Sequence, residues 1–333
     1  MVMRRWTAVI CGAWIVVWVA GLARGGSEWK GGRWVRTPGA TAGTAAGQIE
    51  QIRQYLEAGK ERNAIKAAEE FLEKHSGHEL REDAMMLAGQ AEFNRGRYYQ
   101  AYEWFERLLK EFPNGKLFER ALDREYRVGD AFLNGSKRIV GKVFRLPATD
   151  EGVEILTRIA EHAPGSALAE RALVRIPEFY YGKGKYAEAA ERYDQFLEIF
   201  PKSKRAPYVM LQAARATYAL YKGPRFDETP LLEALQRFTR FNELYPQAAK
   251  REKIPQVLER IRSQRAERLY AAADFYRRSS KPKSALFYYD QVIKDYPKTE
   301  WADRARQAKE QITKPKPARP SIGEWLRRLL PGG

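Results

Sequence analysis

The sequence is poor in the residues that carry disulfide and metal chemistry. Its 333 residues include one cysteine and three histidines, which excludes a disulfide scaffold and a multi-cysteine zinc site. Histidine-centred catalysis also has few residues to draw on. Hydrophobic residues make up 44% of the chain and aromatic residues 12%. This is enough to bury a sizeable core, so a wholly disordered chain is excluded, and the length fits two domains or one repeat array.

Recognisable catalytic motifs are absent as well. The sequence contains no glycine-rich phosphate loop and no local signature of a serine nucleophile. His75 and His78 are three residues apart, as metal ligands on a helix can be, but Gly77 lies between them and no third ligand is evident. We therefore expect no catalytic residues, no metal and no cofactor, and we expect that the protein is not an enzyme.

Positive charge is in excess. The chain has 59 Lys and Arg against 42 Asp and Glu, for a net charge of +17. Residues 1–46 and 301–333 each carry +5, so the 254 residues between them carry only +7. The repeat-containing body is therefore close to balanced, and the basic extensions are where membrane or partner contact is expected. Because the N-terminus predicts export, no nucleic-acid partner is expected.

Residues 1–23 have the features of an export signal. Two arginines precede an uncharged apolar run over 6–23, with Gly21 and Ala23 at the small positions of a cleavage site. The run is also just long enough to span a bilayer, so an uncleaved anchor is the alternative. Residues 24–46 are rich in glycine, threonine and alanine, which predicts a flexible linker.

A signature recurs through residues 47–312, where the hydrophobic period is that of helices. It ends in Phe-Pro or Tyr-Pro. An alanine stands twelve positions before the proline, an aromatic residue eight before it and a large apolar residue five before it. The clear copies end at Pro113, Pro201, Pro246 and Pro297, with a weaker copy at Pro164. These offsets keep to one face of a helix that the proline ends, so each unit is predicted to be a helical hairpin.

These spacings resemble tetratricopeptide-repeat proteins and, more narrowly, are similar to the BamD/YfiO-like proteins of the outer membrane β-barrel assembly machinery. The narrower resemblance is carried by Phe200-Pro201-Lys202-Ser203, Ala234, Phe238, Tyr245-Pro246, Ala273-Asp274-Phe275-Tyr276, Ala285, Tyr289 and Tyr296-Pro297-Lys298-Thr299. It implies an all-α fold, a right-handed superhelical solenoid of tetratricopeptide-like hairpins. It also implies an exported protein-interaction scaffold that supports β-barrel assembly from the periplasm or the inner face of the outer membrane, with a β-barrel assembly subunit among its partners.

Cys11 departs from the family pattern. Family members are held at the membrane through a lipidated cysteine that follows a small residue, whereas Ile10 precedes Cys11 and apolar residues follow it. The resemblance then implies either inner-membrane anchoring by residues 6–23 or recruitment by partners. The alternative function is a generic envelope tetratricopeptide-repeat adaptor for cell-envelope or division complexes.

Four aromatic residues lie off the repeated packing offsets and are the candidates for partner contact. They are Tyr99, Trp104, Tyr181 and Tyr288. Peripheral packing between helices is the alternative for each of them.

Two further segments lie outside the repeat pattern. Residues 134–149 interrupt the array and are expected to contact a partner or an anionic membrane surface, or to be an ordinary connecting loop whose apolar residues fold back. The candidates there are Lys137, Arg138, Lys142, Phe144 and Arg145.

After a Pro/Lys linker over 313–320, residues 321–330 predict an amphipathic helix. It is expected to dock into a partner's groove, to lie in a membrane interface, or to cap its own solenoid. Its apolar face consists of Ile322, Trp325, Leu326, Leu329 and Leu330.

Overall fold

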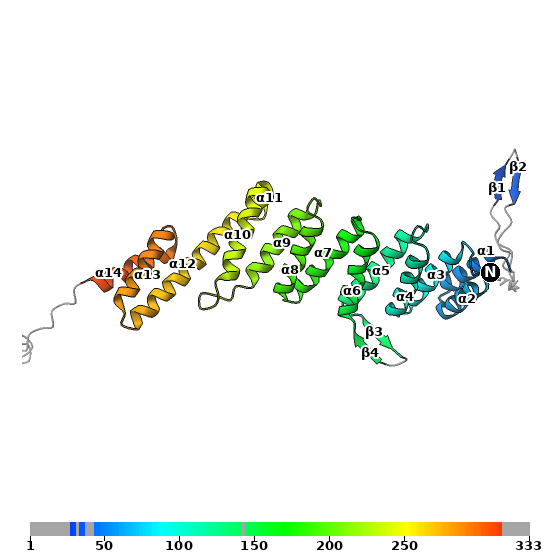
Figure 1. Cartoon of the computed structure of the whole chain (residues 1–333), viewed down its shortest axis with the longest axis horizontal. Helices are drawn as coiled ribbons and strands as arrows, with labels where there is room; N and C mark the ends of the chain where they lie inside the picture. Colours follow the sequence, from blue (N-terminus) through cyan, green and yellow to red (C-terminus); the bar gives the residue numbers. More distant parts are fainter. Residues whose placement is uncertain (1–26, 31–32, 37–42, 142–143, 315–333) are drawn as a thin grey trace, which may run out of the picture. The chain divides into compact units, whose positions relative to one another are not determined.

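The computed structural model of the chain describes residues 27–30, 33–36, 43–141 and 144–314. Within these ranges it contains fourteen helices and two small two-stranded sheets, so the predicted all-α class of tetratricopeptide-type hairpins is confirmed (Figure 1). The chain divides into two compact units, and α5 (Phe118–Leu133) begins in the first and ends in the second.

Unit 1 extends to Val128 and includes Lys137–Leu146. Successive helices of this unit pack side by side (Figure 1). Its further elements are β1 (Ser27–Lys30), β2 (Arg33–Arg36), α1 (Ala45–Glu57), α2 (Glu61–Lys74), α3 (Arg81–Asn94), α4 (Tyr98–Glu111), β3 (Lys137–Val140) and β4 (Phe144–Pro147), of which Pro147 already belongs to unit 2.

Unit 2 comprises Gly129–Ser136 and the chain from Pro147 onward. Its helices again pack each on the next, with the long α12 against both α13 and α14. They are α6 (Thr149–His162), α7 (Ala167–Gly182), α8 (Tyr186–Ile199), α9 (Ala206–Ala219), α10 (Thr229–Leu244), α11 (Pro246–Arg251), α12 (Ile254–Arg278), α13 (Pro282–Asp295) and α14 (Glu300–Thr313).

The helix ends follow the recurring proline. α4, α8, α10 and α13 each end one residue before the aromatic residue that precedes the proline. In each case the aromatic residue caps the helix, and its N–H donates to the carbonyl four residues back, as Phe112 does to Leu108. The proline cannot extend this ladder because it has no N–H. The predicted helix ends are thus confirmed.

Pro246 not only follows the end of one helix but also begins another. It is the first residue of the short helix α11, which Lys253 separates from α12 with a left-handed backbone (φ +56°). Proline suits the first helical position because its fixed φ is helical and an N–H there would have no partner within the helix. The inserted α11 and the 25-residue α12 together lengthen the chain between Pro246 and Pro297.

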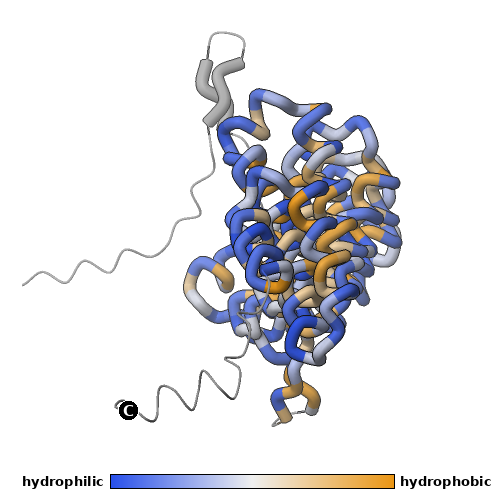
Figure 2. Tube along the Cα trace, turned by 90° about the vertical axis from the view of Figure 1, so that its left-hand side faces the viewer, coloured by the Kyte–Doolittle hydropathy of each residue, from blue (hydrophilic) through white to orange (hydrophobic). Residues whose placement is uncertain are grey.

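The predicted packing positions form the core. The alanines twelve residues before the proline, Ala101, Ala189, Ala234 and Ala285, are all 0% exposed. The aromatic residues eight before it, Phe105, Tyr193, Phe238 and Tyr289, are also fully buried. Figure 2 shows the apolar stretches alternating along the helices with hydrophilic ones. The small alanines allow neighbouring helices to approach closely, and the aromatic rings fill the space beside them.

The linker predicted over residues 24–46 is corrected in two places. β1 and β2 pair antiparallel with Trp29 opposite Trp34, and α1 begins at Ala45 behind the Thr44 cap. Tryptophan and valine favour strands, and a Gly-Gly pair between two such segments is a hairpin sequence. The high glycine content of residues 24–46 led to the prediction of a linker, although the tryptophan and valine residues within this stretch favour strands.

None of the helices in the described ranges combines the length and the apolarity that a membrane span needs. The predicted signal or anchor at residues 1–23, including Cys11, lies outside the described residues.

Candidate protein-interaction site

A groove in unit 2 gathers aromatic side chains around one helix. Its volume is about 870 Å³, and it lies along the second half of α12. We call it the aromatic groove. Its lining residues are Pro224 and Arg225 from the α9–α10 connection, Glu267–Ala272, Asp274, Phe275 and Arg278 from α12, Tyr288 from α13, and Trp301 from α14.

The turn between α12 and α13 brings the groove's helices together. Ser280 has a left-handed backbone (φ +58°), and Pro282 starts α13 at its first position. Ala273 and Ala285 are fully buried in the same core cluster as Tyr289. Small residues on both helices allow close packing, which places the ring of Tyr288 against the α12 side chains.

Stacked aromatic rings join α12 to α13. The rings of Tyr276 and Tyr288 are parallel to within 6°, with centroids 5.4 Å apart. Phe275 meets Tyr276 edge-on at 5.5 Å, and Phe287 meets Tyr288 edge-on at 5.4 Å. Phe275 and Phe287 are 58% and 59% exposed. Side chains of this size left in water are typical of surfaces that a protein partner covers.

A second set of rings extends the groove to α14. The Tyr270 ring lies 5.3 Å from that of Trp301 and 5.5 Å from that of Tyr289. The guanidinium of Arg304 lies 4.5 Å from the centre of the Trp301 ring, which is a cation–π contact. The groove therefore has rings supplied by three helices, held by contacts within the protein.

Arg268 and Glu228 fix the α9–α10 connection to α12. Arg268 donates to the backbone carbonyls of Pro224, at 3.2 Å, and Phe226. The carboxylate of Glu228 lies 3.4 Å from Arg268 and accepts a 2.8 Å hydrogen bond from Arg265. These contacts give one wall of the groove a defined position although it is built from a loop.

Charged groups of both signs border the rings. Asp274 pairs with Arg277 at 2.6 Å and with Arg278 at 3.0 Å. Within the described residues, neither Arg225 nor Glu267 has an ion-pair partner. Burial raises the pKa of Tyr221, and the negative charge of Glu267 adds to the shift. An apolar floor with charged groups at its border is typical of a peptide or protein contact.

The structure places the four sequence-predicted aromatic candidates in different surroundings. All are half-buried. Tyr288 lines the aromatic groove, and Tyr99 lies beneath Arg138, whose guanidinium is 3.6 Å from the ring centre. Tyr181 packs edge-on against Tyr186 beside a buried cluster, and Trp104 has Arg107 at 5.7 Å. The structure therefore brings only Tyr288 of this set into the groove, and partner contact remains a prediction for all four.

The remaining candidates lie on two other segments. Lys137, Arg138, Phe144 and Arg145 lie on the strands β3 and β4. Lys142 lies outside the described residues, as do the five apolar positions of the predicted C-terminal helix, Ile322, Trp325, Leu326, Leu329 and Leu330.

Sequence reasoning missed Phe275, Phe287, Tyr270 and Trp301. A signal for the first two was present, because each directly precedes another aromatic residue within a helix. Adjacent helical residues point about 100° apart, so two neighbouring large aromatics cannot both face the same core. One member of Phe275-Tyr276 and one of Phe287-Tyr288 had to face outward.

Unit 1 contains a smaller cleft of about 430 Å³ with a basic lining. Arg53, Arg120 and Arg124 line it together with Asp83, which pairs with Arg53 at 3.3 Å. Burial lowers the pKa of Arg124, and the neighbouring cations Arg127 and Arg120 lower it further. The local field therefore favours an anionic group in this cleft.

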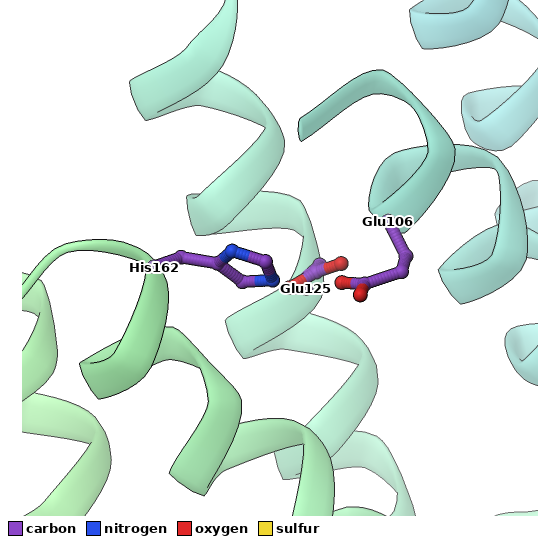
Figure 3. Close-up of side chains that lie close together, drawn as sticks. All are labelled: Glu106, Glu125 and His162. Atoms are coloured by element: carbon purple, nitrogen blue, oxygen red, sulfur yellow. The ribbon is translucent and has the colours of Figure 1, made fainter. Parts of the chain in front are cut away.

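Two buried glutamates of unit 1 face one another. Glu106 of α4 and Glu125 of α5 each place a carboxylate oxygen within 4.8 Å of the other's (Figure 3). Lys110 forms an ion pair with Glu106 at 2.8 Å. His162, drawn in the same figure, is the last residue of α6 in unit 2.

His75 and His78, the histidine pair noted in the sequence, are held by other contacts. The Nε2 atom of His75 lies 3.0 Å from Oε1 of Gln48. The Nδ1 atom of His78 accepts a hydrogen bond from the Leu80 N–H at 3.1 Å. Both rings also pack near Phe71, so packing and hydrogen bonding account for them.

Comparison with known proteins gives two sequence matches and several likenesses in structure. Residues 148–316 match the family YfiO, described as outer membrane lipoprotein, and residues 83–115 match a tetratricopeptide repeat. No curated protein matches the chain.

Solved structures similar to this chain include tetratricopeptide proteins. One is the C-terminal part of a TPR repeat-containing protein from Cytophaga hutchinsonii, with 13% identity, a TM-score of 0.36, and coverage of 80% of this chain and 88% of that one. Another is a TPR repeats protein from Bacteroides fragilis, with 15% identity, a TM-score of 0.36, and coverage of 81% and 98%.

Proposed function

The chain belongs to the YfiO family of outer membrane lipoproteins, and we propose that it is a cell-envelope scaffold that supports the assembly of outer membrane β-barrel proteins. Its tetratricopeptide hairpins indicate protein–protein interaction. In this proposal the protein is not an enzyme. It contributes a rigid surface on which a membrane-embedded assembly subunit and its substrates are held together.

The family match over residues 148–316 carries the proposal. This range begins at the start of α6 and extends past the end of α14, so it contains every residue of the aromatic groove. The groove supports the proposal because its exposed rings are held in place before a partner arrives. A surface ordered in advance loses little conformational entropy on binding.

The proposed location is the periplasmic side of the envelope. The basic and apolar segment at residues 1–23 supports export, and the residues around Cys11 do not form the usual lipid-attachment pattern. We propose that residues 6–23 anchor the protein in the inner membrane or are removed, with recruitment by partners in the second case. Mass analysis of the N-terminus of the native protein distinguishes cleaved, anchored and lipidated forms.

Co-purification from detergent-solubilised envelope tests the proposed function. The expected result is that the tagged full-length protein retains an integral outer membrane protein of β-barrel type, and that depletion of the protein lowers the amount of folded barrel proteins in the outer membrane. Reproducible absence of a barrel protein from the purified complex would refute the assembly role. It would favour the alternative, a generic adaptor for envelope or division complexes.

A further inference from the structure

The segment between α5 and α6 is not part of the helical repeat. It forms a two-stranded sheet of β3 and β4, which we call the basic hairpin, and it ends immediately before the family match begins at residue 148. Between Asn134 and Thr149 the sequence contains no acidic residue, while Lys137, Arg138 and Arg145 lie on the two strands. All charged side chains of the basic hairpin are therefore positive.

The basic hairpin exposes its large apolar side chains. Phe144 is 70% exposed, Leu146 50% and Val140 41%. Among the described residues Phe144 is the most exposed of the large hydrophobic side chains, and three of the ten that are exposed lie on these two short strands. The alternative in which the apolar residues of this segment fold back onto the helices is thus wrong for these three. Figure 2 shows apolar residues on the hairpin, at the lower end of the view.

A cation–π contact connects the first strand of the hairpin to α4. The guanidinium of Arg138 lies 3.6 Å from the ring centre of Tyr99, which belongs to α4 in the same unit. Ile139 is half-buried beside it, whereas all four residues of β4 are exposed. Arg138 thus attaches the first strand, and the second strand presents Phe144 and Leu146 together with Arg145 to the surroundings.

We propose that the basic hairpin binds the surface of an anionic lipid membrane. Basic side chains are attracted to the negative potential of anionic headgroups, and an aromatic and an aliphatic side chain beside them can enter the boundary between headgroups and acyl chains. Charge complementarity favours this occupant. A surface that binds another protein usually carries both basic and acidic side chains, whereas the basic hairpin carries basic ones only, as a uniformly anionic membrane surface requires. The proposal is independent of the assembly role, because the hairpin precedes the family match.

Site-specific fluorescence on the full-length protein tests the proposal. Cys11→Ser leaves the chain without cysteine, and Phe144→Cys then allows an environment-sensitive fluorophore to be attached at position 144. The probe is a vesicle of equal parts phosphatidylglycerol and phosphatidylcholine, compared with phosphatidylcholine alone. The apolar run at 6–23 can bring the protein to both vesicles, whereas the label reports the hairpin alone.

Blue-shifted, increased emission with anionic vesicles and none with neutral vesicles is the expected result. The response should weaken at high salt. Lys137→Gln and Arg145→Gln should each lower the equilibrium constant for membrane insertion about fivefold. This is the factor in binding that one basic residue near an anionic membrane surface typically contributes. A label at position 244, through Leu244→Cys, is the matched control because Leu244 is exposed and lies on a helix of the other unit, next to Glu243, and it should not respond.

Three outcomes would overturn the proposal. They are no response at position 144, an equal response to neutral and anionic vesicles, and a response only when solubilised envelope proteins are added. The last outcome would instead assign the hairpin to a protein partner. Circular dichroism of each variant shows whether the helices remain folded, so a failure to fold is recognised separately.

Discussion

The parallel rings of Tyr276 and Tyr288, with centroids 5.4 Å apart, connect α12, which supplies most of the lining of the aromatic groove, to α13. Tyr276 stands 21 residues before Pro297, as Tyr180 does before Pro201, whereas Tyr288 lies off the repeated offsets. The contact therefore links the core of unit 2 to its candidate binding surface. A residue proposed to contact a partner is held here by a residue of the α12–α13 packing.

A double-mutant cycle tests that link. Tyr276→Ala and Tyr288→Ala should each lower the free energy of unfolding, and the two effects should couple by about 1 kcal/mol because removing either ring abolishes the same contact. Urea unfolding of the wild type, both single variants and the double variant measures the coupling. Tyr180, which packs in a different cluster, is the control partner for Tyr276, and that pair should be additive. Additivity for Tyr276 and Tyr288 would show that the stacking contributes nothing.

Phe275→Ala separates binding from stability. Because Phe275 is 58% exposed, its truncation should change the free energy of unfolding by less than about 0.5 kcal/mol. As a central aromatic of the proposed contact, it should cost about 2 kcal/mol of partner affinity. Leu244→Ala is the matched control, since Leu244 is 54% exposed and does not line the groove. Equal partner retention by the two variants in pull-downs would argue against the groove as the contact.

Gly89→Ala should destabilise unit 1. A Cβ atom at this position would lie 2.4 Å from Cε1 of the fully buried Phe105, so the ring or the helix must move. The expected loss is about 1–3 kcal/mol in the free energy of unfolding. Gly182→Ala is the control, because a Cβ there meets nothing within 4 Å, and a small gain of about 0.5 kcal/mol is expected. Denaturant unfolding of both variants makes the comparison, and a neutral Gly89→Ala would show that the core is looser than described.

Alkaline pH should weaken unit 2 through Tyr208. Partial burial of this residue, which is 43% exposed, and a 2.8 Å hydrogen bond to Glu178 raise the pKa of Tyr208 from 10.0 to about 12. Between these values the unfolded chain has lost the phenolic proton while the folded chain retains it. The stabilising contribution is therefore complete below pH 10 and is lost as the pH rises toward about 12.

Tyr208→Phe should make this alkaline loss shallower, because the titrating group is removed while the ring remains. Glu178→Gln should also reduce it, since the Glu178 charge and hydrogen bond are causes of the raised pKa after burial. Unfolding free energies measured below pH 10 and near pH 12 give the slope. A slope unchanged by both substitutions would contradict the assignment.

The helical hairpins were predictable because their determinants are local. Ala189, Tyr193 and Phe196 precede Pro201 at the same distances as the equivalent residues precede the other repeat prolines. Proline has no backbone N–H to continue the hydrogen bonds of the preceding helix, so the helix ends there. Burial of the same positions in the structure reflects one packing solution repeated along the chain. The β1–β2 sheet was missed because Trp29 and Trp34 lie in a stretch dominated by glycine.

The aromatic groove was only partly predictable. Tyr288 was found because it departs from the repeated offsets, whereas Trp301 and Tyr270 become lining residues only when α14 packs on α12. The wall from the α9–α10 connection depends on Arg268 meeting carbonyls more than forty residues away. Contacts at that distance in sequence leave no local pattern, so they require the folded structure.

Photocrosslinking at the groove tests the central claim most directly. A photoreactive phenylalanine analogue placed at position 275 of the full-length protein is irradiated in intact cells, and the crosslinked product is identified by mass spectrometry, with the analogue at position 244 as the control. The account predicts a defined product with an envelope protein of the β-barrel assembly system at position 275 and none at position 244. Identical products at the two positions, or no product at position 275, would contradict it.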